Sequence, residues 1–257
     1  MKESLKEFIK PGSEEEALIK KIDFSKLPQH VAVIMDGNGR WARKRNLPRA
    51  EGHRAGSKAV REIVETCSRI GIKYLTLYAF SKENWKRPKK EVKTLWELLK
   101  DYLKKESNVL VENKFKLNVI GQLDQIPEKA RKELRKVINM TKDNDKFVIN
   151  LALNYSGRSE IIDAIKKFID TDGINKNDLN EELFSKYLYT AGIPDPDLLI
   201  RTSGELRISN FLLWQIAYSE IWVTPILWPD FHRRHMLEAI VEFQERERRF
   251  GGIQPKT

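Results

Sequence analysis

The sequence predicts a single α/β domain with a mainly parallel central sheet of about six strands, covered by helices on both faces. Short apolar, β-branched runs alternate with helical patterns along the 257 residues. The runs are nearly continuously apolar, which is typical of parallel strands buried on both faces. No internal repeat or low-complexity linker divides the chain, so one domain is the simplest organisation.

Six runs have the length and composition of strands. They cover residues 31–35, 74–80, 117–120, 147–153, 198–200 and 221–223. Helical periodicity occupies the intervals between and after them, and several of these segments begin with Ser or Pro, as helices do. The predicted helices cover residues 57–70, 92–113, 127–142, 159–169, 181–189 and 232–249.

The amino terminus is charged and lacks the apolar run of a signal peptide. We expect residues 1–22 to form a charged helical extension and residues 23–257 to form the main domain. Charged and polar residues and prolines interrupt the most apolar stretch, 211–231, so it does not fit a membrane-spanning helix. Cys67 is the only cysteine, and its helical spacing with apolar residues predicts a buried packing thiol. A cytoplasmic protein, at most peripheral at a membrane, is expected.

The net charge of +10 predicts attraction to anions. Nucleic acid, anionic lipid headgroups and phosphorylated small molecules all remain compatible with it. No basic recognition helix, zinc-ligand spacing or RNA-binding aromatic signature is present, so we expect no specific nucleic-acid partner.

Ligands of open parallel sheets bind beyond the carboxyl ends of the strands, so the residues after each apolar run are informative. These residues are 36–41, 81–88, 154–158 and 201–207. Arginines recur among them and predict an anion-binding rim: Arg40, Arg87, Arg158, Arg201 and Arg207.

The first of these loops carries two glycines that flank Asn38. Such a loop lets successive N–H groups converge on a phosphate, and Asp36 at the strand end could hold Mg²⁺ against it. A tight turn followed by a solvated basic helix is an equally good interpretation of this spacing alone. His53 fits a surface or packing role as well as a site role, and Trp85 fits stacking on a ligand or anchoring of its loop. Glu220 lies in an apolar stretch and needs a metal or an arginine at the same rim as a partner.

Seven stretches in order together resemble the cis-prenyltransferase family, which includes undecaprenyl diphosphate synthase. They are residues 30–42, 52–56, 80–88, 154–158, 196–214, 228–231 and 246–252. The resemblance covers nearly the whole chain. It implies that residues 23–257 are the catalytic domain.

The resemblance also implies roles for individual residues. Asp36 would bind Mg²⁺ and be essential for catalysis, and Asn84 would lie over the reacting carbons. Glu220 would help to hold the metal from the second subunit of a homodimer, and residues 249–251 would reach across that dimer. The implied substrate-binding residues are Gly37, Asn38, Gly39, Arg40, Trp41, Arg49, His53, Ser81, Lys82, Glu83, Trp85, Arg87, Arg201, Arg207, Ile208 and Ser209.

The implied reaction is a successive cis condensation of isopentenyl diphosphate onto farnesyl or geranylgeranyl diphosphate. Its product would be a long-chain polyprenyl diphosphate that carries glycans or cell-wall precursors. Transient membrane contact during product release would follow. An apolar tunnel is required, and one wall is expected from Val92, Leu95, Trp96, Leu99, Tyr102 and Leu103. Trp96 is predicted to shorten the product. Leu206 stands where some family members carry a metal-proximal histidine, and it cannot bind Mg²⁺.

Two rival functions fit the sequence less well. An all-helical trans-prenyltransferase would carry Asp-Asp-x-x-Asp motifs, and the chain has none. A non-catalytic partner subunit would generally lose the catalytic residues, whereas Asp36, Asn84, Arg87, Arg201 and Arg207 are all present. A self-sufficient enzyme is therefore favoured.

Overall fold

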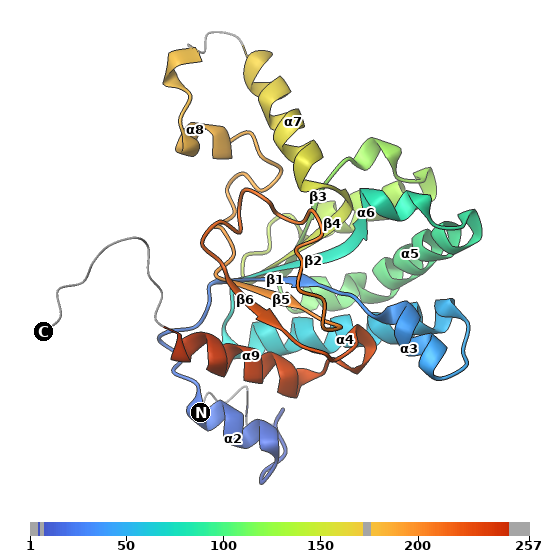
Figure 1. Cartoon of the computed structure of the whole chain (residues 1–257), viewed down its shortest axis with the longest axis vertical. Coiled ribbons are helices and arrows are strands. Elements are labelled where there is room, and N and C mark those ends of the chain that lie inside the picture. The colour runs from blue at the N-terminus through green and yellow to red at the C-terminus, as the bar shows by residue number, and fades with distance from the viewer. Residues whose placement is uncertain (1–4, 6–7, 172–175, 247–257) are drawn as a thin grey trace, which may run out of the picture.

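The computed structural model describes residues 5, 8–171 and 176–246. Its central sheet has six strands in the order β3-β4-β2-β1-β5-β6, and every neighbouring pair is parallel. The predicted fold class is confirmed (Figure 1). The strands are β1 (His30–Ile34), β2 (Tyr74–Ser81), β3 (Phe115–Ile120), β4 (Phe147–Tyr155), β5 (Leu198–Arg201) and β6 (Glu220–Val223).

Helices fill the intervals between the strands, close to the predicted positions. They are α2 (Glu14–Lys21), α3 (Asn38–Lys44), α4 (Arg49–Ile70), α5 (Lys89–Glu112), α6 (Glu128–Thr141), α7 (Gly157–Ile169), α8 (Glu181–Ser185) and α9 (Arg233–Glu245). Single 3₁₀ turns occur at η1 (Lys82–Lys86), η2 (Leu123–Gln125), η3 (Lys176–Asp178) and η4 (Trp228–Asp230). Helix α8 is shorter than predicted, and part of the helix predicted at 232–249, with the 249–251 motif, lies outside the described residues.

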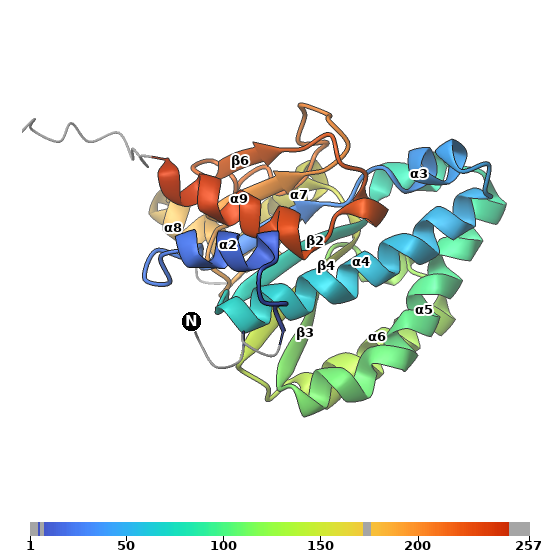
Figure 2. The same cartoon turned by 90° about the horizontal axis from the view of Figure 1, so that it is seen from below.

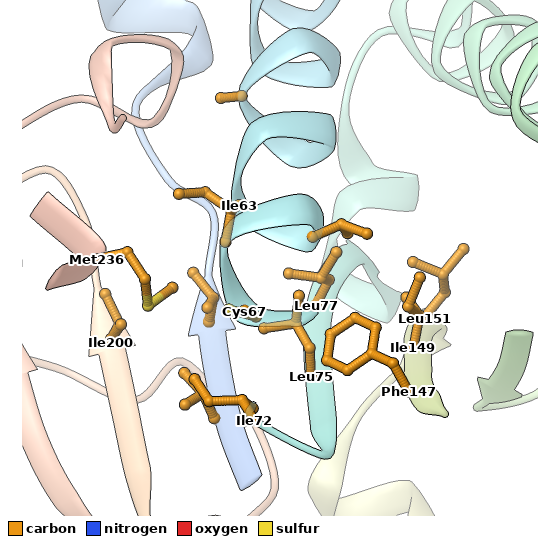
Figure 3. Packing of buried hydrophobic residues seen from close by; sticks show 14 of the residues in the cluster. Ile63, Cys67, Ile72, Leu75, Leu77, Phe147, Ile149, Leu151, Ile200 and Met236 are labelled. Atoms are coloured by element: carbon orange, nitrogen blue, oxygen red, sulfur yellow. The ribbon is translucent and has the colours of Figure 1, made fainter. Parts of the chain in front are cut away.

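The main hydrophobic core lies between the sheet and the helices α4, α5, α6 and α9. Figure 3 shows Ile63 and Cys67 of α4 beside Leu75 and Leu77 of β2. Cys67 is fully buried, and burial raises the pKa of its thiol. It is a packing residue, as predicted.

A second cluster covers the opposite face of the sheet, where the chain is largely irregular. Phe211 stacks on Tyr78 of β2 with ring centroids 4.3 Å apart. Leu212 and Ile216 complete this cover, and α7 lies on the same side, above the sheet in Figure 1. Helices therefore contribute to both faces, but a loop covers the part near the site.

Strand β2 contains an irregularity close to its carboxyl end. Its register against β4 shifts between Tyr78 and Phe80 and again before Ser81. Without the shift, Tyr78 and Phe80 would face the same side. Instead Tyr78 packs in the second cluster and Phe80 in the main core. This bulge lets one strand supply side chains to both sides of the rim.

Helix α4 begins eight residues earlier than its predicted start at residue 57. Gly52 and Gly56 precede the predicted start, but both lie inside the helix where it meets α3. A β-carbon at Gly52 would overlap the carbonyl oxygen of Asn38, and one at Gly56 would overlap the Asn38 side chain. The two glycines therefore permit close packing of α4 against α3.

The amino-terminal segment packs on the rest of the molecule. Helix α2 lies along α9 (Figure 2), and Glu14 pairs with Arg234 at 2.6 Å. Ile9, Ile19 and Ile22 are buried in the main core. Within the described ranges, no helix is long and apolar enough to cross a bilayer.

Candidate active site

Asp36 follows β1 at the carboxyl-end rim of the sheet and is surrounded by donors. Its Oδ2 accepts hydrogen bonds from Arg201 at 2.9 Å and from Arg40 at 3.2 Å. Its Oδ1 accepts from the backbone N–H of Gly37 at 2.6 Å. Arg201 is buried, and burial lowers the pKa of its guanidinium, which the carboxylate of Asp36 opposes. The carboxylate thus compensates a buried arginine at the sheet edge.

A hollow of about 150 Å³, here called hollow A, lies beside Asp36 at the start of α3. Gly37 precedes the helix with a positive φ of 110°, a conformation that suits glycine. Gly39 lies within the helix and makes no such turn. The hollow is lined by Met35, Asp36, Gly37, Asn38, Gly39, Arg40, Arg43, Arg49, His53 and Arg87.

A second hollow of about 500 Å³, hollow B, lies on the other side of Asp36. Two residues of its lining are joined by a hydrogen bond, which Arg201 donates to the hydroxyl of Ser209 at 3.1 Å. Asp36 and Arg87 line both hollows. The members of hollow B are Ile34, Met35, Asp36, Tyr78, Ser81, Glu83, Asn84, Arg87, Arg201, Arg207, Ser209 and Asn210.

An apolar cavity of about 180 Å³, the inner cavity, opens next to both hollows. It shares Asn38 and His53 with hollow A, and Tyr78 and Asn84 with hollow B. Its remaining lining comes mainly from α4, α5, β2 and β4, and includes Leu95, Trp96, Leu99 and Tyr102.

A further cavity of about 480 Å³, the distal cavity, continues between α4 and α5. The two cavities share Val60, Leu77, Tyr102 and Leu151. Of the predicted tunnel wall, Leu95, Trp96, Leu99 and Tyr102 line the inner cavity, Tyr102 and Leu103 the distal one, and Val92 neither.

Glu91 in the first turn of α5 was not predicted to belong to the site. Its two carboxylate oxygens pair with Arg49 at 3.2 Å and Arg87 at 3.1 Å, and His53 lies 3.8 Å away. Only 13% of its side chain is exposed. Glu91 therefore holds two arginines of hollow A in place. The sequence offered no signal beyond a carboxylate four residues after Arg87.

His53 is in the site, where its ring is largely buried. Burial, then the positive charge of Arg87, lowers its pKa to about 4. The ring is therefore neutral near pH 7. Its Nε2 and the Oδ1 of Asn38 are both buried without a hydrogen-bond partner among the described residues. Both atoms lie where hollow A meets the inner cavity, and a polar ligand or water would satisfy them.

Asn84 is held by the turn that carries it. Its side-chain oxygen accepts the backbone N–H of Ser81 at 3.2 Å, which orients the amide toward the junction of hollow B and the inner cavity.

Four of the proposed substrate-binding side chains do not line hollow A, hollow B or the inner cavity. Trp41 donates to Asp230 at 2.6 Å, and Trp85 donates to Asn154 at 2.7 Å. Lys82 donates to Gln122 at 3.1 Å and to Ser159. Ile208 packs beside the second cluster. These side chains support the loops around the site.

Arg158, the fifth arginine expected at the rim, follows β4, and its backbone N–H donates to Asn210 of hollow B at 3.0 Å, but its exposed side chain lines neither hollow. Glu205, which was not predicted, links Arg40 at 3.0 Å and Arg207 at 2.6 Å. Leu206 between them is 86% exposed.

Glu220 does not lie at the same rim as Asp36 within one chain. It is the first residue of β6 and pairs in register with Leu198, the first residue of β5. Asp36 instead lies two residues after β1 ends at Ile34, at the opposite end of the parallel strands. The partner of Glu220 is Arg246, at 2.9 Å. An arginine was one of the two expected partners, but the expected common rim is wrong for a single chain.

Asp36 is the candidate metal ligand of this site. No group of three or more carboxylate, histidine or cysteine side chains suited to a metal occurs among the described residues. Mg²⁺ commonly uses one or two carboxylates together with substrate phosphates and water. A single carboxylate beside two arginine-lined hollows fits that pattern.

Comparisons with known proteins agree with this arrangement. Residues 34–251 match the family described as "Putative undecaprenyl diphosphate synthase". The chain is 53% identical to an isoprenyl transferase of Heliobacterium mobile, over 95% of each chain, and 55% identical to one of Clostridium tetani, over 91% of this chain and 92% of the other. A lavandulyl diphosphate synthase from Lavandula x intermedia, solved with dimethylallyl diphosphate, matches with a TM-score of 0.85 and 34% identity, over 88% of this chain and 99% of that one. The chain therefore belongs to the cis-prenyltransferase family, the isoprenyl transferases that include undecaprenyl diphosphate synthase.

Proposed function

We propose that this isoprenyl transferase condenses isopentenyl diphosphate successively onto farnesyl or geranylgeranyl diphosphate with cis stereochemistry, and that it uses Mg²⁺. The observation that carries the proposal is the pair of arginine-lined hollows that share Asp36 and Arg87 and adjoin an apolar cavity. Two diphosphates need two such anion sites, and a growing hydrocarbon needs the cavity.

The allylic diphosphate is assigned to hollow A. Arg40, Arg49 and Arg87 supply positive charge there, and Gly37 leaves room for the backbone turn. The unpaired Asn38 Oδ1 and His53 Nε2 lie where this hollow meets the inner cavity, so the hydrocarbon would enter the cavity past them. The complex of the lavender relative with dimethylallyl diphosphate is in keeping with an allylic ligand in this family.

Isopentenyl diphosphate is assigned to hollow B, where Arg201, Arg207 and Ser209 converge. Arg87 lies between the two hollows and would contact both ligands. Holding both reactants in fixed positions converts a bimolecular reaction into an effectively unimolecular one.

The chemistry requires stabilisation of a leaving diphosphate as the allylic C–O bond breaks. The arginines of hollow A hold that leaving group in a preorganised site. Mg²⁺, held by Asp36 and the diphosphate, would supply further charge stabilisation. A neutral amide is a poor base, so we assign Asn84 to positioning the reacting carbons and a diphosphate oxygen to accepting the proton.

A homodimer is part of the proposal, because one chain leaves Glu220 remote from Asp36. Strand β6 is at the edge of the sheet, and Tyr218 and Ile221 beside Glu220 are 71% and 42% exposed. A second copy that covers this edge would bury them and could bring its Glu220 toward the metal.

The product would be a long-chain polyprenyl diphosphate that serves as a lipid carrier for glycans or cell-wall precursors. We propose a cytoplasmic enzyme that contacts the membrane transiently as this apolar product leaves.

The test is incorporation of labelled isopentenyl diphosphate by the purified protein with Mg²⁺ and each of the two primers, with products sized by chromatography. Long-chain product is expected, and Asp36→Ala should lose at least about a hundredfold in rate because the metal loses its carboxylate. Absence of product from the folded protein with both primers would contradict the proposal and favour the non-catalytic partner subunit.

A further inference from the structure

A groove on the outer side of α5, against the start of α6, is not used by the site described above. It measures about 680 Å³ and is open to solvent. Its apolar surface comes from Trp85, Val92, Trp96 and Ala130. Trp85 is 37% exposed, so part of its ring is open to solvent at this groove.

Lysines dominate the charge around this groove. Lys89, Lys93, Lys100 and Lys129 line it, with Glu97 and Glu128 as the acidic members. Glu128 pairs with Arg131 and Lys132, and Lys100 pairs with Asp101 at 3.4 Å. Lys89, Lys93 and Lys129 are exposed and form no ion pair with any residue in the described ranges. The groove is therefore a basic surface with an apolar floor.

An exposed tryptophan flanked by unpaired lysines suits one environment in particular. Indole rings favour the interface between headgroups and hydrocarbon, and lysines near an anionic bilayer are attracted to its headgroups while their stems lie on apolar surface. A single-stranded nucleic acid would meet the same charge, but Trp85 is the one exposed ring of this groove on which a base could stack, and the rest of the floor is Val92, Ala130 and the buried Trp96.

The groove also lies next to the cavity assigned to the hydrocarbon. Trp96 lines both the groove and the inner cavity, and its ring is 4.5 Å from that of Phe80 and 5.8 Å from that of Trp85. Helix α5 is thus the wall between them.

We propose that the groove formed by α5 and the start of α6 is the surface that docks on an anionic lipid bilayer. Docking here places the membrane against the helix that encloses the product. The inference deepens the proposed function by naming the membrane-facing surface, and only its consequence for product release rests on that function.

Binding is tested without substrate, by co-sedimentation with vesicles of phosphatidylcholine alone or with 30% phosphatidylglycerol added, a fraction on the order of that in anionic membranes. The variant carries Lys89→Glu, Lys93→Glu and Lys129→Glu. The matched control carries Lys10→Glu, Lys21→Glu and Lys73→Glu, three exposed lysines away from α5 with the same total change in charge.

The native protein should bind the anionic vesicles, and more weakly as salt is raised. The groove variant should partition roughly 100-fold more weakly, and the control less than about threefold more weakly. Equal losses in the two variants would show attraction by net charge alone and overturn the proposal. So would equal binding to both kinds of vesicle, or binding of dodecyl phosphate as a soluble amphiphile without binding of vesicles.

A second measurement distinguishes failure of the docking proposal from failure of the proposed function. The groove variant should retain the first condensation, because none of its three lysines lines a substrate hollow. Anionic vesicles should stimulate repeated turnover by the native protein, and the groove variant should lose that stimulation. No condensation by either protein would contradict the proposed function while leaving the binding result to decide on the surface.

Discussion

His53 gives the stability of the protein a dependence on pH that follows from burial. The ring has a pKa of about 4 in the folded chain and an ordinary pKa of about 6.5 when unfolded. Between these values the unfolded chain binds more protons, so the free energy of unfolding falls as pH is lowered through this window and is fully present above it. His30 behaves likewise, because burial lowers its pKa to about 4 as well.

His53→Gln tests this expectation. Between pH 7.5 and 4.5 the native protein should lose about 2 to 3 kcal/mol more stability than the variant, as measured by urea unfolding at each pH. His30 remains in both proteins and cancels in the comparison. Parallel pH profiles for the two proteins would mean that the pKa of His53 is the same in the folded and the unfolded chain.

Helices α3 and α4 position hollow A through a contact that only glycine permits. Gly52→Ala would push its methyl group into the carbonyl oxygen of Asn38, which belongs to backbone and cannot turn aside. We expect a loss of about 1 to 3 kcal/mol in unfolding free energy and a raised KM for the allylic diphosphate. Thermal unfolding and steady-state kinetics measure the two effects.

Gly39→Ala is the matched control for stability. Its β-carbon would lie 3.0 Å from the guanidinium of Arg49, the far end of a flexible side chain, and the residue is already helical. A change of less than about 0.5 kcal/mol is expected, since alanine favours a helix and Arg49 can move. If Gly39→Ala lost as much unfolding free energy as Gly52→Ala, close packing of α3 on α4 would not explain the effect of Gly52→Ala.

Much of the molecule was predictable because its strands are buried on both faces. Continuous apolar runs give strand positions to within a few residues, and alternation with helices gives the parallel sheet. The loops after those runs then converge at one edge by geometry, which brought Asp36, Arg87 and Arg201 together as predicted. The family resemblance, which the comparisons confirm, added the prediction that two diphosphates bind there.

The errors came from residues whose role depends on long-range contacts. The predicted helix began too late, at residue 57, because the packing reason for Gly52 and Gly56 is the approach of Asn38, which is distant along the chain. Glu91 was missed because its pairing with Arg49 depends on α4 lying against the start of α5. Glu220 was placed at the wrong end of the strands, because an apolar run does not show which end of its strand a flanking carboxylate occupies.

Product length should depend on the size of the inner and distal cavities, which α4, α5 and the sheet enclose. Trp96 is 4% exposed and fills the wall between the inner cavity and the outer groove. Trp96→Ala should lengthen the product by removing a large ring from that wall.

Val60→Phe should shorten the product, because Val60 lies where the inner and distal cavities meet. Chromatographic sizing with farnesyl diphosphate as primer measures the product length of both variants. The rate of the first condensation should stay within about fivefold of native, because neither Trp96 nor Val60 lines hollow A or B. An unchanged product from Trp96→Ala would show that this ring does not limit chain growth, and a shift for Val60→Phe alone would assign that limit to the passage between the cavities.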